Sequence, residues 1–171
     1  MTYNIHPIFV HFPIALLLIY SIIKILPFKK WFPDVSWKHI EVVLLGLGVF
    51  GAFVASSTGE IAEHLTRLNR QLVEMHSTFA SISTWLYGLL LLGEFLYFLT
   101  PYFITKFNSS KIVGFLLFVQ KILINNVLSK IMAFLGLIAI STTGLLGGVM
   151  VFGTSSDPLA SIVLNILGLN F

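Results

Sequence analysis

The sequence of 171 residues contains no cysteine and few charged side chains. The absence of cysteine excludes disulfides, cysteine-ligated zinc, iron–sulfur clusters and thiol catalysis. Asp, Glu, Lys and Arg make up only 10% of the chain, against about 25% in an average soluble domain. Disorder is also excluded, because it requires low hydrophobicity and high net charge. Since the formal net charge is only +3, we expect no nucleic-acid partner.

Apolar residues dominate the chain and make up 57% of it. A soluble fold of this length leaves about 30% of its unfolded surface exposed, which is too much for such a composition. A membrane span needs about 20 mostly apolar residues, and four stretches of the sequence come close to this requirement. We therefore predict an all-α membrane protein with the lipid bilayer as its surroundings. The predicted spans are residues 8–27, 42–58, 76–100 and 129–153.

Two further apolar segments are interrupted by polar side chains. Residues 110–127 contain glutamine, lysine and asparagine, which favours a helix lying in the membrane interface or a lead-in to the fourth span. Residues 157–171 form a short amphipathic tail that we expect at the opposite surface. A fifth span is the alternative for either segment. In both cases residues 1–171 form a single transmembrane domain.

The basic residues predict the orientation of the spans. Eight of the ten lie in the segments that follow the first and third spans, whereas Arg67 and Arg70 lie in the predicted 59–75 turn. The positive-inside rule therefore places both termini and this turn outside the cytoplasm. Interfacial aromatic residues flank the predicted cytoplasmic ends, namely Trp31, Trp37, Tyr97 and Tyr102. The eight lysines are Lys24, Lys29, Lys30, Lys38, Lys106, Lys111, Lys121 and Lys130.

The two halves of the sequence share short motifs. VASSTGEIA at the end of the second span aligns with AISTTGLLG at the end of the fourth, which pairs Thr58 with Thr143 and the glycine after each. HFPIA, from His11, aligns with HSTFA, from His76. We interpret the halves as two helical hairpins that pack as a pseudo-symmetric four-helix bundle. The predicted hairpins are residues 6–75 and 76–156.

Four of the five histidines are predicted to lie at the extracytoplasmic end of this bundle, and only His39 lies at the other end. The first and third spans begin at the extracytoplasmic end and the second ends there, so their polar residues converge. Imidazole and carboxylate groups are suitable ligands for zinc, copper or iron. Glu60 and His64 share a helix face if the helix continues past Gly59. The candidate ligands are His6, His11, Glu60, His64 and His76.

Sequence neighbours place His11 and His76 near helix starts. Proline prefers the first helical turn, so a helix that begins at Pro13 has His11 just before its N-terminus. A helix that begins at Pro7 is instead kinked at Pro13. His76 precedes a Ser–Thr pair, which also indicates a helix start. A histidine at a helix N-terminus favours the neutral imidazole, the form that ligates metals.

The motif HPIFVHFPIAL, which begins at His6, resembles the start of the bacterial membrane family called domain of unknown function 2231. The resemblance to this family includes three further features. The second span ends in Thr-Gly, a histidine opens the third span, and the fourth span has a TTGLLGG-like end. The resemblance covers nearly the whole chain and implies a bacterial inner membrane. Some relatives are fused to cytochrome c-like domains, which implies a redox setting outside the cytoplasm. The matching positions are His6, His11, Pro13, Thr58, Gly59, His76, Thr143 and Gly144.

These observations lead to the hypothesis of a haem b protein in electron transfer. Two histidines from facing helices of a bundle can ligate one haem iron. His11 and His76 are the expected axial pair, because the alignment makes them equivalent residues of the two hairpins. His6 or His64 would be a substitute ligand or a propionate contact. The partner would be a periplasmic or membrane redox protein, and the chain would be a redox component more than an enzyme.

Two alternatives stay open at this point. The first is a divalent zinc, copper or iron site built from the five candidate ligands. The second is a membrane anchor or assembly partner of a redox protein, and a homodimer is compatible with each hypothesis. Glu94 lies in the third span near its cytoplasmic end, where we expect an interhelical hydrogen bond or a contact with the Lys24 ammonium. A proton-relay role for Glu94 is the alternative.

Overall fold

The structure is a computed structural model that describes residues 5–65, 69–107 and 111–169, without the side chains of residues 64, 65, 107 and 156. All regular structure in these ranges is helical, which confirms the predicted all-α class. Seven α-helices and one short 3-10 turn, Thr154–Ser156, follow one another along the described chain. The α-helices are α1 (His6–Ile25), α2 (Phe28–Trp31), α3 (Trp37–Leu65), α4 (Arg70–Phe107), α5 (Lys111–Leu123), α6 (Asn126–Phe152) and α7 (Ala160–Ile166).

Four helices, α1, α3, α4 and α6, are long and apolar enough to cross a membrane, as the sequence predicted. The helices α3 and α4 extend beyond the predicted spans at both ends, whereas α1 and α6 begin earlier and end one or two residues sooner than predicted. The helix α3 continues past Gly59 to Leu65, and α4 begins at Arg70. The predicted 59–75 turn is therefore wrong, because most of it is helical. The side-chain oxygen of Asn69 accepts hydrogen bonds from the next backbone N–H groups and caps α4 at this earlier point.

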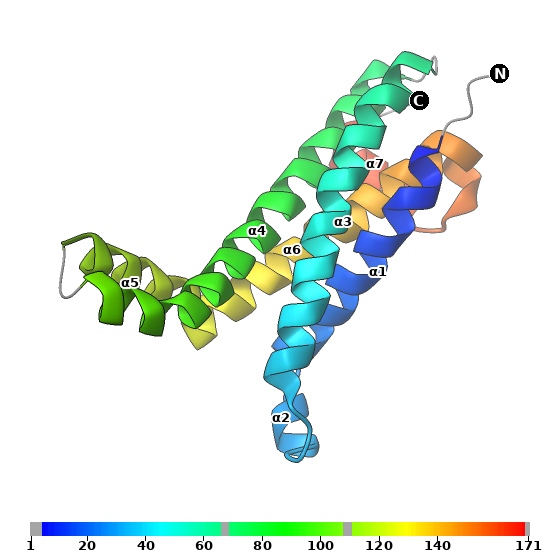
Figure 1. The fold of residues 1–171 in the computed structure, drawn as a ribbon. Helices are drawn as coiled ribbons and strands as arrows, with labels where there is room; N and C mark the ends of the chain where they lie inside the picture. Colours follow the sequence, from blue (N-terminus) through cyan, green and yellow to red (C-terminus); the bar gives the residue numbers. More distant parts are fainter. Residues whose placement is uncertain (1–4, 66–68, 108–110, 170–171) are drawn as a thin grey trace.

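The four long helices form two hairpins. The helix α1 packs mainly against α3 and α4 mainly against α6, and further contacts from α1 to α6 and from α3 to α4 close the ring. Figure 1 shows that α1 begins and α6 ends at the same end of the molecule. The buried core between them takes residues from every long helix, including Leu17, Leu45, Tyr87 and Ala133.

The first helices of the two hairpins share a register of buried residues. On α1 and on α4, buried residues follow His6 and His76 at the same spacings of seven, eleven and fourteen positions. These are Pro13, Leu17 and Tyr20 on α1, and Ser83, Tyr87 and Leu90 on α4. The structural counterpart of His76 is therefore His6, and the sequence alignment of His11 with His76 is out of register by five residues.

Glycines on the second helix of each hairpin agree with this pairing of the two hairpins. A Cβ atom added to Gly48 of α3 would lie 2.5 Å from Cδ2 of Leu17, and one added to Gly136 of α6 would lie 2.8 Å from Cζ of Tyr87. Since Leu17 and Tyr87 are counterparts, so are Gly48 and Gly136. Each helix pair can approach this closely only because the position carries no side chain.

The remaining helices cover the two ends of the bundle. The segment predicted as interfacial forms the separate helix α5, which lies beside the last turns of α4 with Leu123 against Gly93 (Figure 1). Asn125 then caps α6, which begins three residues before the predicted fourth span. In the tail, α7 packs on the beginning of α4 and the end of α6, where Ala160 and Leu164 are buried.

Candidate functional site

The structure brings two histidines together where α1 and α4 begin their paths through the bundle. The ring centroids of His6 and His76 are 6.4 Å apart, and the ring planes are nearly perpendicular at 82°. His6 is the first residue of α1, with Pro7 in the first turn. His76 lies in the second turn of α4, so the expectation that it opens a helix is wrong. We call the end of the bundle that contains this pair the histidine end.

Hydrogen bonds to the neighbouring helices hold both rings. Nδ1 of His6 lies 3.0 Å from Oγ1 of Thr58, and this hydroxyl donates its own proton to the Ala55 carbonyl oxygen at 2.9 Å. In this arrangement the hydroxyl accepts from Nδ1–H of His6, and the Ala55 backbone is a further hydrogen-bond partner of the same ring. Nδ1 of His76 lies 3.0 Å from the carbonyl oxygen of Thr143, which only accepts. Both neutral rings thus carry their proton on Nδ1 and their lone pair on Nε2.

A glycine lies against each ring. A Cβ atom added to Gly59 would lie 3.2 Å from Cε1 of His6, and one added to Gly147 would lie 3.3 Å from Cε1 of His76. The sequence alignment had paired Gly59 with Gly144, three residues earlier on α6. The structure replaces Gly144 by Gly147, because it is Gly147 that faces the histidine.

The other predicted ligands do not join the pair in the described structure. His11 is exposed, and its Nδ1 faces the carbonyl oxygen of Pro7 on its own helix. Five residues correspond to about 140° around a helix, so His6 and His11 lie on different faces of α1. Glu60 is exposed as well, and the side chain of His64 lies outside the described residues. Among the described residues no group of three or more His, Asp or Glu side chains could hold a metal ion.

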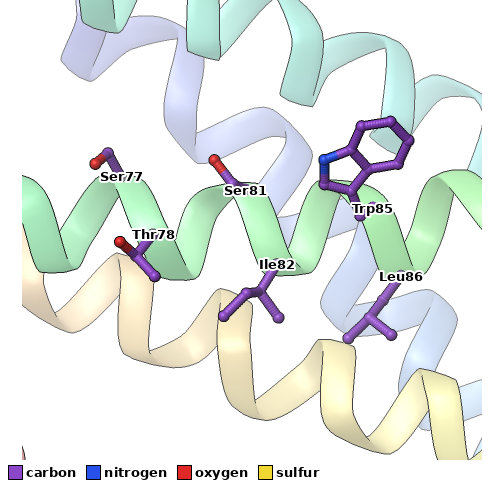
Figure 2. Close-up of a pocket in the computed structure, with 6 residues that line it drawn as sticks. All are labelled: Ser77, Thr78, Ser81, Ile82, Trp85 and Leu86. Atoms are coloured by element: carbon purple, nitrogen blue, oxygen red, sulfur yellow. The ribbon is translucent and has the colours of Figure 1, made fainter.

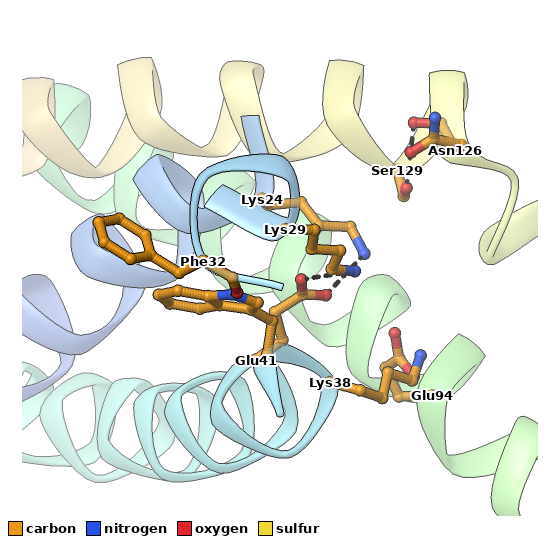
Figure 3. A network of polar contacts seen from close by, with 9 residues as sticks. Lys24, Lys29, Phe32, Lys38, Glu41, Glu94, Asn126 and Ser129 are labelled. Atoms are coloured by element: carbon orange, nitrogen blue, oxygen red, sulfur yellow. Dashed lines mark hydrogen bonds and ion pairs between the residues drawn. The ribbon is translucent and has the colours of Figure 1, made fainter. Parts of the chain in front are cut away.

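A second polar cluster lies at the opposite end of the bundle, which we call the lysine end after the eight lysines named above. Glu41 is only 1% exposed, and its two carboxylate oxygens lie 3.1 Å from Nζ of Lys24 and 3.0 Å from Nζ of Lys29 (Figure 3). Glu94 accepts a hydrogen bond from Lys38 of α3. The expected interhelical hydrogen bond of Glu94 is therefore confirmed, whereas the alternative contact with Lys24 is wrong, because Lys24 pairs with Glu41.

Sequence reasoning missed Glu41, although a signal was present. Glu41 stands four residues before the buried Leu45, so both lie on the core face of α3. Charged residues at membrane depth are costly unless they are paired. Because each of these two buried carboxylates has a lysine partner, the cluster can join α1, α2, α3 and α4 electrostatically.

A hydroxyl pair lies in the core between the two ends. Oγ of Ser21 and Oη of Tyr87 are 2.7 Å apart and link α1 with α4. The ring of Tyr20 meets that of Tyr87 edge to face, with centroids 6.1 Å apart. All three side chains are fully buried. The pair therefore supplies an interhelical hydrogen bond where water is excluded.

An open pocket of about 490 Å³ lies on the outward face of α4 (Figure 2). The hydroxyls of Ser77 and Thr78 at one end of it both donate to the Glu74 carbonyl oxygen of the same helix. Trp85 towards its other end is 73% exposed. The rest of the lining is the hydroxyl of Ser81 and the apolar surface of Ile82, Trp85 and Leu86.

Comparisons with known proteins identify the family of the chain. No curated protein and no solved structure matches the chain significantly. A family model matches residues 2–155, nearly the whole sequence, and its description is "Predicted membrane protein (DUF2231)". The match agrees with the resemblance of the HPIFVHFPIAL motif and with the four long apolar helices. The chain therefore belongs to this family of predicted membrane proteins.

Proposed function

We propose that this membrane protein binds haem b between His6 and His76 and carries electrons at the histidine end. The haem would supply one-electron redox chemistry, and the two imidazoles would hold its iron from opposite faces. We also propose the setting that the sequence indicates, a bacterial inner membrane with both termini outside the cytoplasm. The electron partner would then be a periplasmic or membrane redox protein.

The main support for this proposal is the distance between the ring centroids of His6 and His76. An imidazole nitrogen lies about 2.0–2.1 Å from a bound metal, which places the ring centroid roughly 3.2 Å from the ion. Two rings on opposite sides of one ion are then about 6.4 Å apart, whereas a tetrahedral ion draws them to about 5 Å. The centroids of His6 and His76 are separated by 6.4 Å. This spacing is compatible with His6 and His76 together holding one iron.

The hydrogen bonds of the pair support the same conclusion. A histidine that ligates a metal usually donates its other ring N–H to a protein acceptor, which fixes the tautomer and the ring orientation. His6 has such an acceptor in Thr58, and His76 has one in the Thr143 carbonyl group. In both rings the nitrogen that carries the lone pair is Nε2. Gly59 and Gly147 let the two rings pack directly on the backbones of α3 and α6, where any side chain would press on Cε1.

A divalent zinc, copper or iron ion is the second candidate for the same nitrogens. It has less support, because a structural or catalytic ion of this kind takes three or four protein ligands. The described residues offer no such group, and Glu60 is exposed. A role as an anchor or assembly partner of a redox protein would use neither histidine as a ligand.

The test is an absorbance spectrum of the detergent-purified protein, oxidised and reduced, after expression with added haem precursor. We expect a Soret band in the wild type and its loss in His6→Ala and His76→Ala. His39→Ala is the matched control, since His39 is exposed at the lysine end and lies beside Ser36. A wild type without a Soret band, or a band that survives both substitutions, overturns the proposal.

Two further measurements separate the alternatives. His11→Ala keeps the Soret band if His6 and His76 are the ligands, and loses it if the iron is held by the pair that the sequence alignment suggested. Elemental analysis of protein purified without a histidine tag tests the divalent ion. One zinc, copper or non-haem iron per chain in a protein without haem would replace the haem proposal by the metal alternative.

A further inference from the structure

A second open pocket lies between α5 and α6 at the lysine end. Its volume is about 330 Å³, and its lining comes from the last turns of α5, the turn after it and the first turn of α6. The lining residues are Phe118, Lys121, Ile122, Asn125 and Leu128. Three of them are apolar and two are polar, so the pocket is amphipathic.

The apolar part of the pocket is open to the surroundings. Phe118 is 62% exposed and Ile122 is 42% exposed. Both are large hydrophobic residues, so they present apolar surface to the surroundings. Leu128 contributes the facing wall from α6. A surface of this kind is suited to a hydrocarbon chain of a lipid.

The polar part of the pocket consists of hydrogen-bond donors. Oδ1 of Asn125 accepts the backbone N–H groups of Val127 and Leu128, at 3.0 and 3.1 Å, when it caps α6. The donors of Asn125 are then the two N–H bonds of its amide nitrogen. Lys121 lies in the last turn of α5 and lines the same pocket, and its side chain is exposed. No ion pair within the described part of the chain involves Lys121.

The end of the bundle that contains the pocket is positively charged. Eight lysines gather at this end of the bundle, against three acidic residues. The two buried carboxylates, Glu41 and Glu94, are already paired with Lys24, Lys29 and Lys38. The lysine end therefore attracts anions, and the anionic groups that a membrane presents at its surface are phospholipid headgroups.

We propose that the pocket between α5 and α6 binds one anionic phospholipid. The phosphate lies between the Lys121 ammonium and the Asn125 amide, and one acyl chain lies along Phe118, Ile122 and Leu128. The site is independent of the histidine end and of any haem there. It would give the short helix α5 a fixed attachment to the leaflet at the lysine end.

The test is native mass spectrometry of the full chain in detergent with added phosphatidylglycerol or phosphatidylcholine. We expect one phosphatidylglycerol to stay bound and to be retained about fivefold better than phosphatidylcholine. Lys121→Ala should abolish this preference, and Lys121→Arg should keep it because the charge remains. Phe118→Ala should lower the retention of both lipids, because it removes the wall for the acyl chain.

Lys30→Ala is the matched control, since it removes one exposed lysine of the same end on α2, away from the pocket. It should leave the preference unchanged. Equal loss in Lys30→Ala and Lys121→Ala would overturn the proposal in favour of general charge attraction. Equal retention of the two lipids by the wild type would also overturn it. Circular dichroism and gel filtration identify any variant that has not folded. If Lys121→Ala does not fold, the test rests on the other two variants: Lys121→Arg should keep the lipid preference, and Phe118→Ala should lower the retention of both lipids.

Discussion

The hydrogen bond between His6 and Thr58 has no side-chain equivalent in the second hairpin. Nδ1 of His6 donates to the threonine hydroxyl at 3.0 Å, whereas Nδ1 of His76 donates to a backbone carbonyl, that of Thr143. The two histidines are counterparts in the fold and each has a backbone acceptor, Ala55 for His6 and Thr143 for His76, so the Thr58 hydroxyl is an additional acceptor that only His6 has. This difference makes the contribution of each bond separable by mutation.

Thr58→Val should remove one of the two acceptors of the His6 ring, and Thr143→Val should leave His76 in place. Valine has no hydroxyl group to accept from His6, but it keeps the backbone carbonyl that His76 uses. We expect the first variant to lose about 1 kcal/mol of unfolding free energy. Side-chain ¹⁵N NMR of histidine-labelled protein should show a shifted Nδ1 resonance of His6 in Thr58→Val only. A change at His76 in Thr143→Val would contradict the assignment of the carbonyl as acceptor.

Gly136→Ala should destabilise the second hairpin. The new Cβ atom would lie 2.8 Å from Cζ of Tyr87, a fully buried ring held by Ser21. Overpacking of this kind costs about 1–3 kcal/mol. Gly88→Ala is the matched control, because no atom lies within 4 Å of its added Cβ. Thermal unfolding in detergent should show a lower midpoint for the first variant, with no loss for the second.

The Ser21–Tyr87 hydrogen bond should appear as a coupling energy between α1 and α4. Ser21→Ala and Tyr87→Phe each leave one buried hydroxyl without its partner, and the double variant removes both. Interhelical hydrogen bonds in membrane proteins contribute about 0.6 kcal/mol on average and up to roughly 1.7 kcal/mol. A double-mutant cycle of unfolding free energies measures this coupling. Strict additivity of the two single variants would show that the bond contributes nothing.

Glu41→Gln should be more damaging than Lys29→Met. The first removes the charge that neutralises Lys24, whose side chain is only 13% exposed, and breaking a buried pair costs about 3–5 kcal/mol. Lys29 is 60% exposed, and an exposed pair contributes only about 0–1 kcal/mol. Chemical denaturation in detergent measures both effects. The double variant Lys24→Met/Glu41→Leu should recover part of the loss, and its failure to do so would contradict the electrostatic explanation.

The histidine pair shows why part of the site escaped prediction from the sequence. His6 and His11 both precede a proline within two residues, and the motif that follows His11 looks more like the one that follows His76. Only one of the two can face the core, because they lie about 140° apart on the helix. The face that is buried is fixed by Leu17 and its partner Gly48. In a helix that is apolar on every side, the sequence does not mark this face.

Composition and local pattern alone determined that this is an all-α membrane protein with four long apolar helices, and that its lysines gather at one end. These properties depend on runs of residues along one chain segment, so they need no knowledge of the neighbours. Tertiary structure decided the partners: His6 with His76, Gly147 with the His76 ring, and Lys24 with Glu41. The reason is that helix rotation and register are set by where backbones can approach closely, and that depends on the facing helix.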